Sequence, residues 1–319
     1  MTDDTGTADG RETTEEARVT ADGRETTGDR GAADVAAATE GAGDLPGPLV
    51  GADWLAERID RTDVVVLDAS VGAHRGAGRR IPGARRFDLD GALSDHTAPL
   101  PHTMPGAGRF TEEMRNLGID DVSTVVVYDT AGIYSAARAW WMLRAMGFDR
   151  VAVLDGGLPA WAAAGMPMED RAPGGTARTG DFTARPRDGM LVGSGAVAAA
   201  LADPGAAVLD ARSRERFTGD GAEPRPGLRP GHMPGALNLP FGEIQRGGRM
   251  LPAHELRSVF RALSGERERL VVSCGSGVTA CVLALGAELA GYRAVSVYDG
   301  SWSEWGRPSH LPVETGEPG

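Results

Sequence analysis

The sequence predicts an α/β protein with two tandem doubly wound domains, each a central parallel sheet flanked by helices. Two observations predict this fold class. The chain contains a long internal repeat, and each copy of it alternates short apolar runs with segments of helical periodicity. Its 319 residues are enough for two domains of ordinary size.

The repeat consists of matching segments in the same order. The first copy reads VVVLDAS (64–70), RIPGARRFDLD (80–90), STVVVYDTAGIYSAARAWWMLRAMGF (123–148) and VAVLDGGLPAW (151–161). The second copy reads AAVLDARS (206–213), GHMPGALNLPF (231–241), RLVVSCGSGVTACVLALGAELAGY (269–292) and VSVYDGSWSEW (295–305). The spacing agrees within a few residues, so we expect two copies of one fold.

Strands are predicted where β-branched residues run together without a polar face. In the first copy these are residues 64–67, 125–128 and 151–154, and in the second copy the clearest is 270–273. Runs that are apolar on both faces are typical of parallel sheets covered by helices on each side. The intervening helices are expected at 112–117, 135–146, 255–263 and 278–290.

Composition changes sharply along the chain and suggests the boundaries. Residues 1–44 carry twelve Asp or Glu and four Arg, with no aromatic residue, and are predicted to be a disordered acidic tail. Residues 45–169 form the first predicted domain. A linker rich in Pro, Gly and Arg is expected at 170–188, and the second domain at 189–319.

Charge and cysteine content exclude several classes of protein. The formal net charge of −12 argues against a nucleic-acid partner. Two cysteines are too few for a disulfide-rich scaffold or a four-cysteine zinc site. No apolar run approaches the length of a membrane helix, and the first residues lack a secretory signal. We therefore expect no membrane association and a cytoplasmic location.

One cysteine stands where a nucleophile is expected. The predicted strand 270–273 leads into Cys274, then Gly275-Ser276-Gly277, then a helix. Backbone N–H groups at such a turn form an anion-binding nest, and the same field favours thiolate over thiol. Cys274 is therefore the predicted nucleophile. Cys281, within the following helix, is predicted to be a core residue.

The segment CGSGVTA (274–280), in the second of two repeated α/β units, resembles the active-site loop of tandem-domain rhodanese sulfurtransferases. Its CG(S/T)GVT form is similar to that of 3-mercaptopyruvate sulfurtransferases, whereas thiosulfate sulfurtransferases usually have CRKGVT. The resemblance covers about 50–308. It implies that the second domain is catalytic and that the first, with Asp129 in place of the cysteine, is a non-catalytic wall of the site.

The resemblance also implies roles for further residues. Arg216 in RSRERF and Arg225 in AEPRPG match arginines that bind the carboxylate and carbonyl of the substrate. Ser276, His102 and Asp90 match a proton relay that serves the departing pyruvate enolate. Backbone N–H groups of the loop surround the transferred sulfur, which implicates Gly275, Gly277, Val278 and Thr279.

The expected function is transfer of sulfur from 3-mercaptopyruvate to a thiophilic acceptor through a Cys274 persulfide, with release of pyruvate. The resemblance implies no metal and no organic cofactor. The acceptor is expected to be cyanide, a small thiol, or a protein dithiol such as a thioredoxin-like protein.

Two alternatives stay open, a thiosulfate sulfurtransferase using the same site and a non-enzymatic binding module of the same fold. A phosphatase or arsenate reductase is disfavoured, because the Cys-x5-Arg pattern of their loops would need arginine where Ala280 stands. A dinucleotide-binding enzyme is disfavoured because no predicted strand leads into G-x-G-x-x-G.

Overall fold

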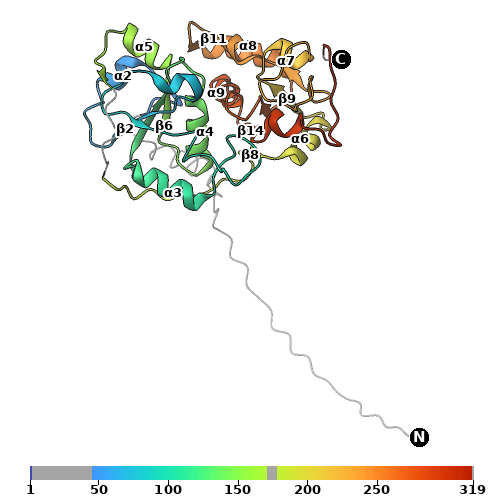
Figure 1. Ribbon diagram of the computed structural model, residues 1–319, viewed down its shortest axis with the longest axis horizontal. Coiled ribbons are helices and arrows are strands. Elements are labelled where there is room, and N and C mark those ends of the chain that lie inside the picture. The colour runs from blue at the N-terminus through green and yellow to red at the C-terminus, as the bar shows by residue number, and fades with distance from the viewer. Residues whose placement is uncertain (2–44, 171–177, 318–319) are drawn as a thin grey trace, which may run out of the picture. The chain divides into compact units, whose positions relative to one another are not determined.

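The computed structural model describes Met1 and residues 45–170 and 178–317 (Figure 1). The predicted acidic tail, Met1 apart, and residues 171–177 of the predicted linker lie outside the described residues. Among those that are described, no helix is long and apolar enough to cross a membrane.

The first domain is a five-stranded parallel sheet in the order β1-β6-β5-β2-β4. Its strands are β1 (Leu49–Val50), β2 (Val64–Asp68), β4 (Arg85–Arg86), β5 (Thr124–Tyr128) and β6 (Val151–Leu154). Its helices are α2 (Ala52–Ala56), η1 (Gly72–Gly76), α3 (Ala107–Asn116), α4 (Ala136–Ala145) and α5 (Gly157–Ala163). A small antiparallel pair joins β3 (Arg79–Arg80) to β7 (Glu169–Asp170).

The second domain repeats this sheet in the equivalent order β10-β9-β13-β14-β8, again all parallel. Its strands are β8 (Leu191–Val192), β9 (Ala206–Asp210), β10 (Leu237–Asn238), β13 (Arg269–Ser273) and β14 (Ala294–Tyr298). Its helices are α6 (Ser194–Leu201), α7 (Arg214–Thr218), η2 (Phe241–Ile244), α8 (Ala253–Ser264), α9 (Ala280–Ala290) and α10 (Ser301–Trp305). A hairpin joins β11 (Gln245–Arg246) and β12 (Arg249–Met250). The predicted fold class is confirmed.

One predicted helix boundary is wrong. Helix α3 begins at Ala107, five residues before the predicted start at residue 112. The reason is its packing, because Phe110 and Met114 are four residues apart on one face and both are buried. The apolar pattern alone did not reveal the first turn, which contains Gly108.

The two domains pack through α4 and α9, which contact each other between the sheets (Figure 1). Both helices are apolar around most of their circumference, as expected for helices buried on all sides. An ion pair between Arg144 and Glu288 joins them, and one continuous apolar core includes residues of both domains. These contacts fix the position of one sheet relative to the other.

Residues 178–188 of the predicted linker run along the first domain without helix or strand. The Phe182 ring is buried, and its backbone N–H donates to the carbonyl of Ile119 (3.1 Å). Close by, a Cβ at Gly180 would lie 2.0 Å from the same carbonyl oxygen, so only glycine fits there. This segment is bound to the first domain over residues 178–188.

Candidate active site

Cys274 lies at the carboxyl end of β13, where a short loop leads into α9. It is 2% exposed and borders a cavity of about 410 Å3. The lining residues are Val71, His102 and Tyr134 from the first domain, and Arg216, Pro224, Arg225, Cys274, Gly275, Ser276, Val278 and Thr279 from the second. Eight of the ten predicted site residues thus line one cavity between the domains.

The other two predicted site residues lie just behind the cavity wall. Asp90 contacts His102 from the side away from the loop. Gly277 forms the turn of the loop with φ +76°, and a Cβ there would lie 2.8 Å from the carbonyl oxygen of Asp299. The turn therefore requires glycine for its backbone shape and for space.

A hydrogen-bonded chain of side chains reaches Ser276 from the first domain. His102 Nδ1 lies 3.0 Å from Ser276 Oγ, and His102 Nε2 lies 3.2 Å from Asp90 Oδ1. Because an ionised carboxylate only accepts hydrogen bonds, the ring proton belongs on Nε2, and Nδ1 accepts from the Ser276 hydroxyl. This is the arrangement in which a histidine can take a proton from a hydroxyl.

The pKa shifts of this chain agree with that arrangement. Burial lowers the pKa of His102 below its usual value, against the opposing effect of Asp90, so the imidazole is neutral at neutral pH. Burial also opposes ionisation of Asp90, but hydrogen bonds from the Gly72 N–H (2.9 Å) and from His102 hold the pKa of Asp90 below its usual range. Asp90 is therefore a carboxylate, and His102 can act as a base.

Two arginines lie over the nucleophile loop. The position of a Cβ on Gly275 would be 3.1 Å from Arg216 Nη2 and 3.8 Å from Arg225 Nη1. Glu223, whose side chain is buried, orients Arg216 through a 2.7 Å ion pair. No side-chain partner of Arg225 occurs within the described part of the chain, so its guanidinium is available to an anion in the cavity.

The loop itself offers unused hydrogen-bond donors. Within the described residues, the backbone N–H groups of 275–279 have no acceptor. Four of these five residues line the cavity. The loop also precedes α9 directly, where the helix dipole adds positive potential. Such a nest binds an anionic atom next to the Cys274 sulfur.

Comparison with known proteins agrees with this geometry. The rhodanese-like domain family matches residues 51–164 and again 195–307. The 3-mercaptopyruvate sulfurtransferase of Escherichia coli K12 is 42% identical over 277 residues, which cover 83% of this chain and 97% of that protein. The chain belongs to the rhodanese family.

Further relatives extend this rhodanese match. The mitochondrial thiosulfate/3-mercaptopyruvate sulfurtransferase 1 of Arabidopsis thaliana is 37% identical over 301 residues, covering 85% of this chain and 79% of that protein. The crystal structure of SseA from Escherichia coli aligns with a TM-score of 0.71 at 39% identity, covering 81% of this chain and 99% of that one.

The two rhodanese-like domains differ at the loop after the central strand. In the first domain Asp129 occupies the position of Cys274 and is fully buried. Its carboxylate accepts the backbone N–H groups of Ala131, Tyr134, Ser135 and Ala136 at 2.8–2.9 Å. The N–H donors of the first rhodanese-like loop are thus already occupied by the Asp129 side chain, whereas the second loop leaves its donors without an acceptor among the described residues.

Sequence reasoning did not single out four residues of this rhodanese site, one of which is Pro224 in the cavity lining. Tyr134 and Val71 line the cavity from the first domain, and Glu223 orients Arg216. The repeat itself could have revealed Tyr134, because it stands five residues after Asp129, as Thr279 does after Cys274. Glu223 stands two residues before Arg225 in the AEPRPG segment, so that segment could have indicated it. Nothing local indicates that Val71 approaches the loop, since its place depends on how distant segments pack.

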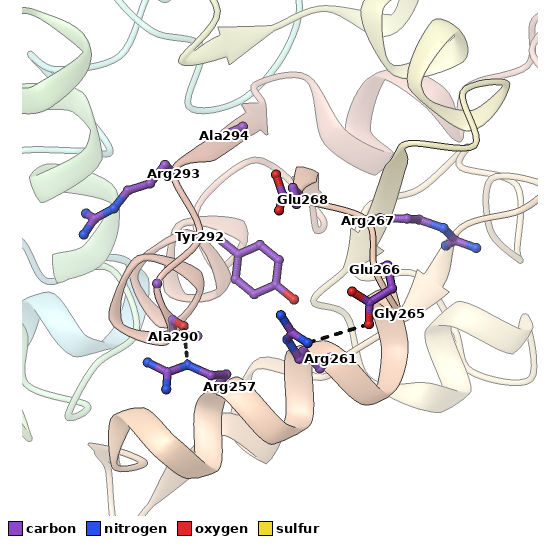
Figure 2. A pocket seen from close by; sticks show the side chains of 11 residues that line it. Arg257, Arg261, Gly265, Glu266, Arg267, Glu268, Ala290, Tyr292, Arg293 and Ala294 are labelled. Carbon is purple, nitrogen blue, oxygen red and sulfur yellow. Dashed lines mark hydrogen bonds and ion pairs between the residues drawn. The ribbon is translucent and has the colours of Figure 1, made fainter. Parts of the chain in front are cut away.

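A second hollow, of about 470 Å3, lies at the opposite end of the second sheet, near the starts of β13 and β14. Figure 2 shows that its arginines do not converge. Arg257 donates to the Ala290 carbonyl (3.1 Å) and Arg261 pairs with Glu266 (3.6 Å), while Arg267 and Arg293 point outward on opposite sides. It contains no cysteine or histidine, so the candidate reaction site is the cavity at Cys274.

No group of three or more His, Cys, Asp or Glu side chains that could hold a metal ion occurs among the residues with described positions.

Proposed function

We propose that the chain is a sulfurtransferase that accepts sulfur from 3-mercaptopyruvate on Cys274, releases pyruvate and passes the sulfur to a thiophilic acceptor. The observation that carries this proposal is the cavity in which Cys274, the Ser276–His102–Asp90 chain and two arginines meet. Mercaptopyruvate has the three matching features, which are a thiol sulfur, a carboxylate and a ketone.

In the first step the Cys274 thiolate attacks the sulfur of mercaptopyruvate. The S–S bond forms as the carbon–sulfur bond breaks, and the electron pair of that bond leaves with the pyruvate enolate. Arg216 and Arg225 hold the carboxylate and stabilise the negative charge on the enolate oxygen. The outer sulfur of the resulting persulfide lies against the unused N–H groups of the loop.

The proton follows the Ser276–His102 chain. Ser276 takes the proton of the donor thiol while its own proton moves to Nδ1 of His102, and the Asp90 carboxylate stabilises the imidazolium. The same proton then returns through Ser276 to the methylene carbon of the enolate, which yields pyruvate. Cys274 is left as a persulfide anion, so charge and protons balance.

In the second step an acceptor attacks the outer sulfur and Cys274 leaves as a thiolate. Cyanide then becomes thiocyanate, and a thiol becomes a persulfide. A protein dithiol of the thioredoxin type would release sulfide and close its own disulfide. The covalent intermediate implies ping-pong kinetics, because pyruvate leaves before the acceptor reacts.

Gly275 supports mercaptopyruvate over thiosulfate as the donor. A Cβ at this position would lie 3.1 Å from Arg216 Nη2, so a side chain here would force the Arg216 guanidinium to shift. The absence of a side chain keeps both arginines over the loop, where a carboxylate can bind both. Thiosulfate remains the second candidate donor, supported by the name of the Arabidopsis relative, which includes both substrates.

The test is steady-state sulfur transfer to cyanide with the two donors in parallel and Cys274→Ser as the blank. We expect kcat/KM to favour mercaptopyruvate by more than about tenfold, which is about 1.4 kcal/mol of transition-state preference. A preference for thiosulfate would replace the proposed donor. Activity with neither donor, while Cys274 still reacts with iodoacetamide, would contradict the proposal as a whole.

A further inference from the structure

One segment of each domain, at equivalent positions of the internal repeat, contacts the other domain. In one, the backbone N–H of Met104 donates to Asp299 at the end of β14 (3.0 Å). In the other, the backbone N–H of Met250 donates to Asp155 at the end of β6 (3.0 Å). Each domain thus offers an aspartate, at the end of the equivalent strand, to a segment of the other.

The two segments differ two residues before the methionine. The second-domain segment has Gly248 there with φ +77°, and the first-domain segment has His102 with φ +57°. Glycine adopts this left-handed backbone freely, whereas histidine adopts it uncommonly and at a cost that surrounding contacts offset. His102 is one of two non-glycine residues with positive φ in the described chain. Its conformation therefore needs a physical cause.

Arg138 on α4 supplies the contacts. Its side chain is fully buried, and Nη2 donates to the His102 carbonyl (2.9 Å) and to Asp299 Oδ1 (2.6 Å). Nη1 lies 3.5 Å from the Gly277 carbonyl oxygen in the nucleophile loop. One guanidinium thus contacts both backbone segments whose side chains form the His102–Ser276 hydrogen bond.

The equivalent contact between the domains, from Met250 to Asp155, has no such arginine. Arg138 is nine residues after Asp129, and the residue nine after Cys274 is Leu283, which is fully buried in the core. Asp155 instead forms a 3.4 Å ion pair with Arg249, the residue before Met250, and the Arg249 side chain is half exposed. The fold therefore does not need a buried arginine at this helix position. It has one only at the contact of the segment that carries His102.

We propose that Arg138 is a positioning residue, which with Asp299 holds the His102 backbone so that the imidazole meets Ser276 across the domain boundary. The inference rests on the proposed function, because the His102–Ser276 contact matters for the proton released by a thiol donor. Thiosulfate carries no such proton and leaves no enolate, so its use is independent of this contact.

The test separates positioning from stability by neutralising both charges in Arg138→Leu/Asp299→Asn. Removing both charges leaves no unpaired charge beside the buried position 138, and leucine is the residue that the other helix has there. We expect a melting temperature within a few degrees of the wild type. We expect kcat with mercaptopyruvate to fall roughly ten- to hundredfold with little change in KM, while thiosulfate-dependent transfer is retained. Wild-type kcat in this double variant would overturn the proposal.

Asp155→Asn is the matched control, because it makes the same change at the equivalent contact between the domains. It should keep wild-type kcat, and an equal loss in Asp155→Asn and Asp299→Asn would overturn the proposal. Crystal structures of these two variants give a readout that needs no substrate. We expect the 3.0 Å His102–Ser276 contact to be lost in Asp299→Asn and kept in Asp155→Asn, and an intact contact in both would equally refute it. If the wild type does not use mercaptopyruvate, the proposed function fails while these distances still decide the role of Arg138.

Discussion

Ser276→Ala removes a single oxygen atom from the proposed proton path. Ser276 is buried, and the only hydrogen-bond partner of its side chain among the described residues is His102, at 3.0 Å. Loss of that bond should cost about 1 kcal/mol of folding free energy, so the protein stays folded. The catalytic effect should be larger, because general acid–base catalysis contributes roughly 10²–10⁴-fold, or about 2.7–5.5 kcal/mol.

The assay is pyruvate release from mercaptopyruvate, followed in parallel with thiocyanate formation from thiosulfate. With mercaptopyruvate we expect kcat to fall by at least about a hundredfold and KM to change little, because the two arginines proposed to bind the carboxylate are untouched. With thiosulfate we expect nearly wild-type turnover, since no proton is transferred. A loss of less than about threefold, or an equal loss with both donors, would refute the assigned proton path.

Three further predictions follow from the same geometry. Arg225→Ala should raise KM for mercaptopyruvate roughly ten- to hundredfold, which is the effect of losing a charge-assisted hydrogen bond, and should raise KM for thiosulfate less. Equal increases with both donors would contradict the proposed carboxylate-binding role of Arg225. Asp90→Asn should move the acid limb of the pH profile of kcat to lower pH. Protonated His102 cannot accept a proton, and Asp90 raises the pKa of His102, so removing the carboxylate lowers that pKa. An acid limb at unchanged pH would show that His102 does not cause it. Cys281→Ala should keep transfer and the full alkylation stoichiometry at pH 8, because burial raises the pKa of that thiol to about 12; loss of one labelled site would show that Cys281 is reactive.

Much of the fold follows from short-range patterns. The apolar runs at 64–67 and 125–128 are buried in the sheet of the first domain, and the structure extends each by one residue. The error at the start of α3 shows the limit of such patterns, since Phe110 reveals its role only when the helix packs. The location of Cys274 was also predictable, because a strand, a glycine-bearing turn and a helix are adjacent in the chain.

The Ser276–His102–Asp90 chain was harder to predict from the sequence. Asp90 and His102 are 12 residues apart, but His102 and Ser276 are separated by 174 residues. No periodicity connects positions so distant, so only resemblance to a family suggested the set. The structure brings the three side chains within hydrogen-bonding distance, and their roles in catalysis are proposals that the variants above test.

From the amino-acid order alone came the two-domain α/β architecture, the nucleophile candidate and the glycine-bearing loop around it, because each depends on backbone periodicity or on neighbours in the chain. Packing of the domains decided the rest. It placed Tyr134 on the cavity wall, aligned Arg216 through Glu223, and paired the buried Arg138 with Asp299, 161 residues away in the chain. Such contacts arise from the match of two folded surfaces, and that match exists only after both sheets and the helices α4 and α9 have formed.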